Sequence, residues 1–218
     1  MICLKKVSPR YILVVILGII AGVVSSNVIF STTGFSLFGV HSENPPSYAG
    51  MDNADLAALA FEVLEYIRDG DFEALAEITH PDFGVVFSPS ATITLAANRR
   101  FTAEQIAQFA TDNTIYVWGI NDIGEPIELT PVDYFARFVF SSDYFSASMI
   151  GINRIVRSGN ALENITEEFP GVRFVDFHIP GEDRYPPDEL DWSSLRLGFE
   201  EHEDKLWLTV IVHSRWTV

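Results

Sequence analysis

The alternation of apolar and polar residues is clearest in the last stretch of the chain. Leu195, Leu197 and Phe199 alternate with polar or small residues, which is the period of a half-buried β-strand. The charged segment 201–205 predicts a turn, and the residues that follow, 206–213, are largely apolar on both faces. A strand with two apolar faces is typical of a sheet centre that is covered on both sides. We therefore predict a terminal β-hairpin whose second strand is central to the fold.

Helical spacing marks the region that follows residue 51. Apolar residues recur every three or four positions across 56–67 and form a single stripe, which predicts an amphipathic helix. Asp52 or Asn53 can cap the start of this helix, and Gly70 ends it. A second, shorter helix is predicted over 72–78.

The sequence predicts mainly short strands after the second helix. Two or three N-terminal helices followed by mainly antiparallel strands predict an α+β fold, with the helices packed on one face of a curved sheet. Polar connections at 160–171 and 180–191 separate the last elements. Further strands are predicted at 84–88, 115–120, 127–129, 151–156 and 173–179, and further helices at 103–110 and 131–138.

An apolar run at residues 11–30 predicts one transmembrane helix. As a helix, 20 residues span about 30 Å, which matches the hydrocarbon core of a bilayer. Lys5, Lys6 and Arg10 precede the run, and no Lys or Arg follows until Arg68. Because basic flanks stay in the cytoplasm, we expect a single-pass protein of the cell membrane with its domain outside.

The expected organisation follows from this anchor. Residues 1–10 form a basic cytoplasmic segment, 11–30 the anchor, 31–50 a linker and 51–218 an extracytoplasmic α+β domain. The small residues at 24–26 also fit a cleavage site, so a secreted protein released from a signal peptide is the alternative. Both interpretations export the domain.

Composition narrows the classes of partner. The formal net charge is −16, and the basic residues before the apolar run leave the domain more acidic still. Such a surface repels phosphate backbones, which argues against nucleic acid as a partner. The single cysteine, Cys3, excludes an internal disulfide and a cysteine-based metal site. No spacing of His, Asp or Glu predicts another metal site or a cofactor.

The helical stripe at 56–67 is followed by Gly70-Asp71-Phe72 and Leu75, and then by the predicted strands. This order of elements resembles the NTF2-like (SnoaL-like) cone fold. The resemblance implies a cavity between the concave face of the sheet and the helices. Short sequence motifs lie at 80–81 with 84–89, 118–119 with 124–127, 191–195, and 207–213 with 216–217. These motifs resemble an uncharacterised group of bacterial secreted or membrane-attached proteins. That resemblance implies no established reaction or catalytic residue.

Asp176 and His178 are the candidate catalytic residues. They lie two apart in a predicted strand, so both project from one face, where a carboxylate can orient an imidazole as a general base. The alternative is that Val175 and Phe177 are buried, while Asp176 and His178 face solvent.

The candidate ligand-binding residues are a histidine and three tryptophans. His213 shares one face of the last predicted strand with Trp207, and aromatic rings beside an imidazole can bind a polar or aromatic ligand. Trp118 and Trp216 can contribute further stacking surfaces. The alternative is that these side chains belong to the core. An apolar sheet face without helices would need cover, for which a homodimer is one solution.

No nucleophile elbow, P-loop or dinucleotide-binding glycine pattern is present. The sequence therefore favours binding over catalysis: a small apolar or aromatic ligand, or a partner protein of the envelope. A cavity hydrolase or isomerase that uses the Asp–His pair is one alternative, and a structural envelope module is the other.

Overall fold

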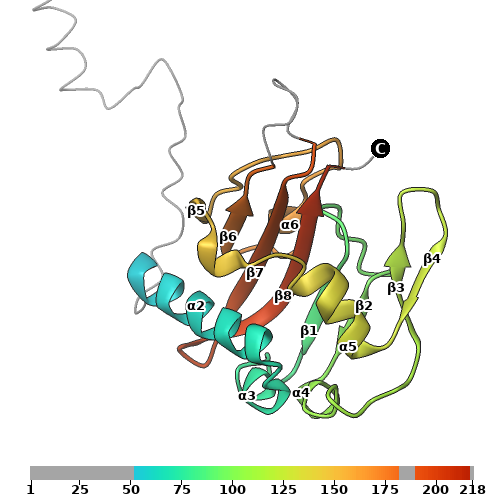
Figure 1. Cartoon of the computed structure of the whole chain (residues 1–218). Coiled ribbons are helices and arrows are strands. Elements are labelled where there is room, and N and C mark those ends of the chain that lie inside the picture. The colour runs from blue at the N-terminus through green and yellow to red at the C-terminus, as the bar shows by residue number, and fades with distance from the viewer. Residues whose placement is uncertain (1–51, 182–189, 217–218) are drawn as a thin grey trace, which may run out of the picture. The chain divides into compact units, whose positions relative to one another are not determined.

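The computed structural model describes residues 52–181 and 190–216 (Figure 1). The predicted basic segment, anchor and linker, at 1–10, 11–30 and 31–50, lie outside the described residues, as does most of the connection at 180–191. Among the helices that are described, none has the length and apolar character needed to cross a membrane.

A six-stranded mixed sheet forms the centre of the fold. Its strand order is β2-β1-β8-β7-β6-β5, and every neighbouring pair is antiparallel except β1 and β8, which run parallel. The α+β class and the central position of the last strand are confirmed, whereas the parallel pair was not predicted. The strands are β1 (Val85–Ser88), β2 (Arg99–Phe101), β5 (Met149–Ile152), β6 (Arg173–Ile179), β7 (Ser193–His202) and β8 (Lys205–Arg215).

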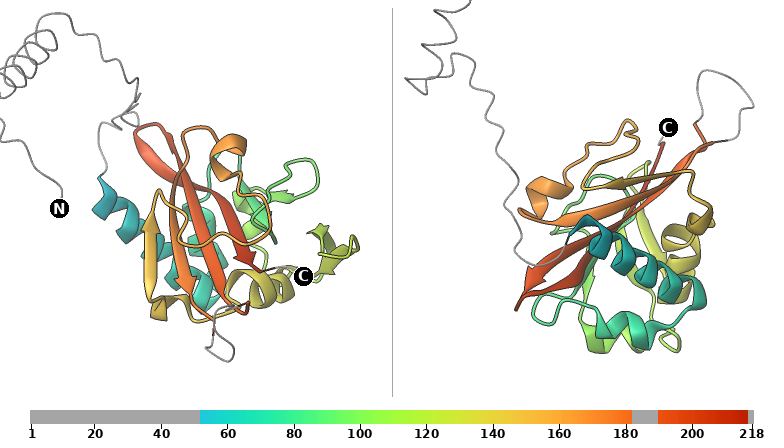
Figure 2. Two further views of the ribbon diagram at one scale, coloured as in Figure 1. Left: turned by 90° about the horizontal axis from the view of Figure 1, so that it is seen from above. Right: turned by 90° about the vertical axis from the view of Figure 1, so that its left-hand side faces the viewer.

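Helices cover both faces of the sheet unequally. Helix α2 crosses one face of the central strands, and the short helix α6 lies behind the other face (Figure 2). The helices are α2 (Asn53–Asp69), α3 (Phe72–Glu77), α4 (Ala103–Ile106), α5 (Pro131–Tyr134) with its π-helical continuation η1 (Phe135–Val139), the 3-10 turn η2 (Tyr144–Ser146) and α6 (Ile165–Glu168).

Helix α2 begins and ends where its sequence predicts. The side chain of Asp52 accepts hydrogen bonds from the backbone N–H groups of Ala54 and Asp55, and Asp55 returns the bond to complete a capping box. Gly70 follows the helix in the left-handed conformation, with φ of 66°, which a residue without Cβ adopts at little cost.

Helix α6 lies inside the connection 160–171, which the sequence predicts only as polar. At four residues it is too short to show a helical period. Ile165 buries its side chain in the cluster behind the sheet, and the amide group of Asn164 bonds both backbone groups of Ile93, at 2.8 Å each. These tertiary contacts explain the helix where local spacing does not.

The terminal hairpin has a tighter turn than predicted. Strands β7 and β8 continue through most of segment 201–205, and only Glu203 and Asp204 remain in the turn. Both residues have positive φ, 53° and 60°, as in the two-residue turns whose twist matches that of the strands.

The fifth strand also differs from its prediction. It covers 149–152 rather than 151–156, because Asn153 has a φ of 52° and turns the chain away from the sheet.

The main core lies between the sheet and α2, and it is rich in aromatic side chains. Phe87 of β1 contacts the rings of Phe101, Phe109 and Trp118 at centroid distances of 5.5–6.1 Å. Trp118 stacks on Tyr134 at 3.8 Å and 8°. Such offset and edge-on contacts add to the stability from burial alone. Strands β3 (Tyr116–Ile120) and β4 (Pro126–Leu129) form a two-stranded arm beside the sheet (Figure 1). Trp118 of β3 belongs to the main core.

Candidate functional site

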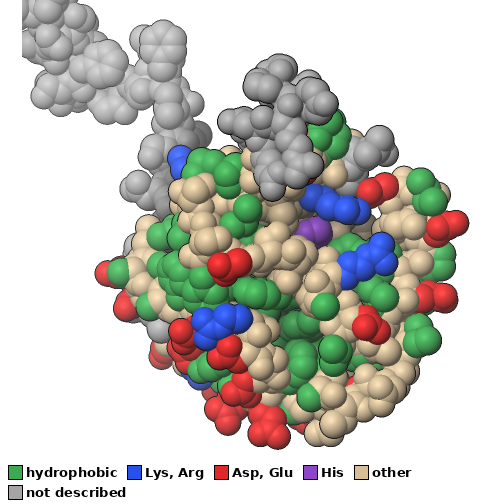
Figure 3. Space-filling view, in the orientation of Figure 1, with side chains coloured by type: hydrophobic (Ala, Val, Ile, Leu, Met, Phe, Trp, Pro, Cys, Tyr) green, Lys and Arg blue, Asp and Glu red, His purple; other side chains and the backbone are tan. Residues whose placement is uncertain are grey.

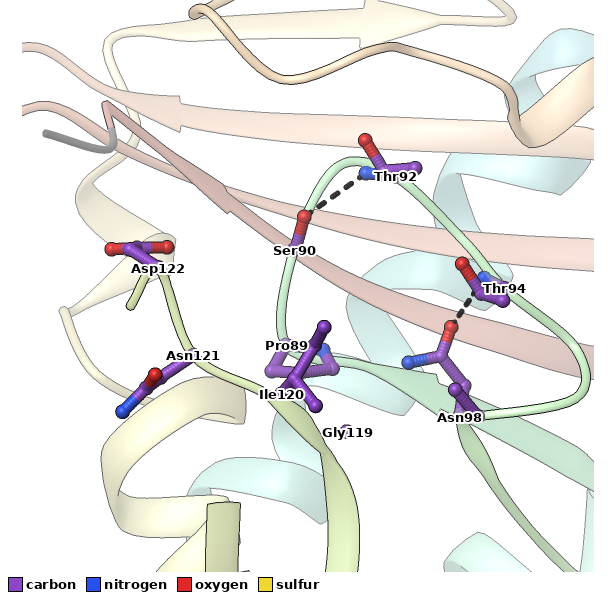
Figure 4. A pocket seen from close by; sticks show the side chains of 10 residues that line it. Pro89, Ser90, Thr92, Thr94, Asn98, Gly119, Ile120, Asn121 and Asp122 are labelled. Carbon is purple, nitrogen blue, oxygen red and sulfur yellow. Dashed lines mark hydrogen bonds between the residues drawn. The ribbon is translucent and has the colours of Figure 1, made fainter. Parts of the chain in front are cut away.

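A partly enclosed cleft lies at the edge of the sheet where β1 and β8 end. Because these strands are parallel, their carboxyl ends meet at the same edge. The cleft has a volume of about 290 Å³, at the lower end of the range for small-molecule sites. Figure 4 shows its walls: the loop after β1 on one side and the turn of the β3–β4 arm on the other. Its lining residues are Pro89, Ser90, Thr92, Thr94, Ala97, Asn98, Gly119, Ile120, Asn121 and Asp122.

The loop after β1 places hydrogen-bond donors on its wall of the cleft. The Oδ1 atom of Asn98 accepts a bond from the N–H of Thr94 at 2.6 Å, which fixes the amide and leaves its NH₂ group without a partner among the described residues. The Oγ atom of Ser90 likewise accepts from the N–H of Thr92 at 3.1 Å. These oxygens are occupied as acceptors, so the loop can offer N–H and O–H hydrogens to a ligand.

Gly119 lets the two walls approach. A Cβ atom there would lie 3.1 Å from Cγ of Pro89 and 3.3 Å from Nδ2 of Asn98, closer than ordinary contacts. The φ of Gly119 is 152°, which also disfavours other residues.

The opposite wall carries a carboxylate. The Oδ2 atom of Asp122 lies 3.5 Å from Nη2 of Arg215, which extends from the end of β8. Asn121 holds the turn in shape, since its Oδ1 accepts bonds from the N–H groups of Ile123 and Glu125. The cleft therefore places donors on one wall and an acceptor on the other.

His213 lies beside the cleft, and its Nε2 atom closes a circuit of hydrogen-bonding distances with three hydroxyl groups, which we call the hydroxyl ring. Its Nε2 atom is 3.4 Å from Oγ of Ser141 and 3.3 Å from Oγ of Ser193. The hydroxyl of Tyr144 closes this hydroxyl ring at 3.0 Å from Ser141 and 2.6 Å from Ser193. Only 4% of His213 is exposed. In Figure 3 one histidine reaches the surface above α5, with basic side chains next to it.

The surroundings of His213 keep its imidazole neutral. Burial lowers the pKa of His213 to about 4, and the positive charge of Arg215 acts in the same direction. The backbone carbonyl of Pro89 faces the ring and opposes the shift, although Nδ1 has no full hydrogen bond among the described residues. Burial raises the pKa of Tyr144, so its phenol stays protonated at neutral pH.

The predicted pair Asp176 and His178 is fully buried on the sheet face opposite α2. The carboxylate of Asp176 accepts a bond from the N–H of Val156 at 2.8 Å and lies 3.3 Å from Nε of Arg196. Nδ1 of His178 lies 2.8 Å from the hydroxyl of Ser194. Asp176 makes no hydrogen bond to His178 in the described part of the chain. The carboxylate therefore orients an arginine instead of the imidazole.

The solvent-exposed alternative for this pair is wrong. Val175 and Phe177 enter the core below α2, as that alternative required. The other face of β6 is covered as well, because Arg196 also pairs with Glu163 of the segment that passes behind the sheet. Burial raises the pKa of Asp176, and Arg196 opposes the shift.

The candidate ligand-binding tryptophans lie in different places. Trp118 is fully buried, and its Nε1 donates to the carbonyl of Leu129 at 2.9 Å. Trp207 lies near the β7–β8 turn, under the ammonium group of Lys205 at 4.0 Å. Along β8 it is six residues from His213, or about 20 Å. Trp216 follows β8 and is 36% exposed. Of the four predicted residues, only His213 adjoins the cleft.

Sequence reasoning missed Asn98, Thr94 and Ser193, and it identified no base partner for Ser141. The one signal for the first two is a loop rich in Ser, Thr and Asn after β1, in a stretch without a clear period. No periodicity in the sequence predicts that Ser141 and Ser193 lie close together, because only the tertiary fold brings them into proximity.

Within 52–181 and 190–216, no three His, Cys, Asp or Glu side chains are grouped so as to hold a metal ion. Comparisons with protein families, with curated proteins and with solved structures found no match to this chain.

Proposed function

We propose that this chain is a membrane-anchored, extracytoplasmic domain that binds a small, oxygen-rich polar molecule, such as a saccharide unit, in the cleft between β1 and the β3–β4 arm. The side-chain donors of Asn98, Ser90 and Thr94 carry the proposal. They line the cleft, backbone N–H groups hold the side chains of Asn98 and Ser90 in place, and the side-chain NH₂ and hydroxyl groups donate to no partner in the described chain. A molecule with ether, hydroxyl or carbonyl oxygens satisfies them.

The charge of the cleft supports an uncharged ligand. Asp122 is the ionisable side chain in its lining, and its own cationic partner is Arg215. An anionic ligand would meet the carboxylate of Asp122, while a polyol can donate a hydroxyl to it. The ligand is thus matched by donors on one side and an acceptor on the other.

The packing of the interior supports a polar ligand over the apolar one that the sequence favours. Trp118, Tyr134 and Phe87 fill the core between the sheet and the helices with ring-to-ring contacts. An apolar ligand bound among them would have to displace rings that are already packed.

The export of the domain rests on the sequence. The apolar run 11–30 with its basic flank favours an anchor whose following domain lies outside the cytoplasm. N-terminal helices on one face of a mainly antiparallel sheet are compatible with the NTF2-like resemblance, which we retain as part of the proposal.

Calorimetric titration of the full-length chain tests the ligand class. The probes are glucose, N-acetylglucosamine and their β-1,4-linked disaccharides, with indole as an apolar aromatic probe. We expect at least one saccharide to bind. Asn98→Asp should weaken that binding at least about tenfold, because the carboxylate keeps the acceptor for Thr94 but replaces the donor.

Thr94→Val removes a second donor at constant shape and should also weaken saccharide binding. Thr111→Val, on an exposed turn that is not part of the cleft lining, is the matched control and should bind as the unaltered protein does. Binding of indole alone, or saccharide binding that Asn98→Asp leaves intact, would contradict the proposal.

A further inference from the structure

The hydroxyl ring that includes Nε2 of His213 takes no part in the proposed binding of a ligand in the cleft. A buried imidazole whose Nε2 faces two serine hydroxyls is more than packing requires, because a single donor would satisfy that nitrogen. The ring also stands at the rim of the cleft, since Arg215 of the same strand reaches the cleft residue Asp122 and Pro89 both lines the cleft and faces the imidazole.

Ser141 and Ser193 differ in their exposure to solvent. Ser141 is exposed, in the bend after η1, and its Oγ lies 3.4 Å from Nε2 of His213. Ser193 is half-buried at the start of β7, and its short 2.6 Å bond to the hydroxyl of Tyr144 holds it in the ring. A substrate can reach Ser141 directly.

We propose that Ser141 and His213 form a nucleophile–base pair that hydrolyses a carboxylic ester, most simply a short acyl group carried on a hydroxyl of the bound molecule. A nucleophile and a base within hydrogen-bond reach, with a third group facing the base, is the arrangement that activates serine, and separations are often longer before substrate binds. The carbonyl of Pro89 is the third group here. The nature of the acylated molecule rests on the proposed function, but the ester chemistry does not.

The reaction balances without a cofactor. The Oγ atom of Ser141 bonds to the ester carbonyl carbon while its proton passes to Nε2 of His213. The tetrahedral intermediate then expels the alcohol, which takes that proton as its C–O bond breaks. Water attacks the acyl-serine, His213 accepts a proton from it, and the acid leaves as Ser141 regains its hydrogen.

Neighbouring groups fit these steps. Burial and Arg215 lower the pKa of His213 to about 4, so its Nε2 is unprotonated at pH 7 and open to the serine proton, as a weaker base than a free imidazole. The hydroxyl of Tyr144 lies 3.0 Å from Oγ of Ser141, so it lies near the carbonyl group that Ser141 attacks and can donate to the carbonyl oxygen as that oxygen gains charge.

Two measurements on the full-length protein test the pair. A fluorophosphonate probe should phosphonylate Ser141, which peptide mass spectrometry locates, and p-nitrophenyl acetate should be hydrolysed. Ser141→Ala and His213→Gln should each lower kcat/KM at least about 100-fold. Ser148→Ala, an exposed serine a few residues away, is the control and should leave turnover unchanged.

Each contrary outcome is distinct. Absence of label on the unaltered protein, label on Ser193 instead, or equal turnover by Ser141→Ala would overturn the proposal, and the first needs no variant to fold. Neither assay requires a ligand in the cleft, so failure of the saccharide titration leaves this test intact.

Discussion

Two buried ionisable groups, His213 and Asp176, have pKa values shifted by their burial. For His213 burial and Arg215 both favour the neutral ring. For Asp176 burial favours the protonated form, while Arg196 stabilises the charge. The two groups lie on opposite faces of the sheet. His213 lies at the rim of the cleft, and Asp176 lies beside Arg196, which also pairs with Glu163. Each makes stability depend on pH in its own direction.

The shift of His213 predicts acid sensitivity. Its folded pKa is about 4 against an ordinary value of 6.5, so between these values the unfolded chain binds a proton that the folded chain does not. Stability is therefore lost as pH falls from about 6.5 to 4, by up to about 3 kcal/mol. Urea denaturation of the unaltered protein and of His213→Gln at pH 7 and 4.5 measures this contribution.

The variant should lose less stability than the unaltered protein over that interval. Equal losses would show that other groups, such as Asp176 or surface carboxylates, account for the pH dependence.

The pairing of Arg196 predicts a large effect on folding. Its side chain is fully buried and bridges Asp176 and Glu163, so Arg196→Met leaves two carboxylates without their cation. Removal of one member of a buried pair costs about 3–5 kcal/mol. Arg68→Met, which breaks the exposed pair with Asp69, should cost less than about 1 kcal/mol. Urea denaturation compares the two, and similar losses would contradict a structural role for Arg196.

At the scale of elements, the turn between β7 and β8 uses unfavourable residues. Glu203 and Asp204 both adopt positive φ, which residues with side chains avoid. Replacing the pair by Asn-Gly, the preferred sequence for this turn, should raise the free energy of unfolding by about 1 kcal/mol. Thermal unfolding measures the gain. A loss of stability would mean that the side chains of Glu203 and Asp204 contribute interactions that outweigh their backbone cost.

The elements that the sequence predicts well are those with a repeated spacing. The stripe of α2 and the alternation in β6, β7 and β8 extend over enough residues to define a period. Strand β2 has three residues and α6 has four, too few for any period, and tertiary contacts determine both. The π-helix η1 begins inside a predicted α-helix, and local spacing cannot distinguish the two forms.

The candidate site is predicted less well for the same reason. His213 was predicted as a ligand-binding residue because it shares one strand face with Trp207. Asn98 and Ser141 lie in loops without a period. Asn98 becomes a candidate because the fold places its loop opposite the β3–β4 arm, and Ser141 because the fold places it beside His213. The tryptophans were predicted as stacking surfaces for a ligand, but Trp118 is a core side chain.

At the scale of the whole molecule, acidic side chains gather on the surface over α2 and α3, while basic groups lie beside the histidine above α5 (Figure 3). The surface above α5 thus carries more positive charge than the surface over α2 and α3. We expect the surface over α2 and α3 to repel anionic partners.

The proposed anchor predicts the location of the single cysteine. In intact cells a membrane-impermeant maleimide should not label Cys3, because the N-terminus is expected in the cytoplasm, and labelling should appear after permeabilisation. In a Cys3→Ser background, Ser42→Cys in the linker should be labelled in intact cells. Loss of Cys3 from the mature protein would favour signal cleavage, and the reverse labelling pattern would contradict the orientation.

The most direct test of the central claim is a native mass spectrum of the gently purified full-length chain, beside that of Asn98→Asp. The cleft of about 290 Å³ accommodates a molecule of a few hundred daltons. We expect the unaltered protein to carry an oxygen-rich species of that size, and Asn98→Asp to have lost it while keeping the same oligomeric state. A species that both proteins retain equally, or one that is purely hydrocarbon, would contradict a polar ligand held by the donors of this cleft.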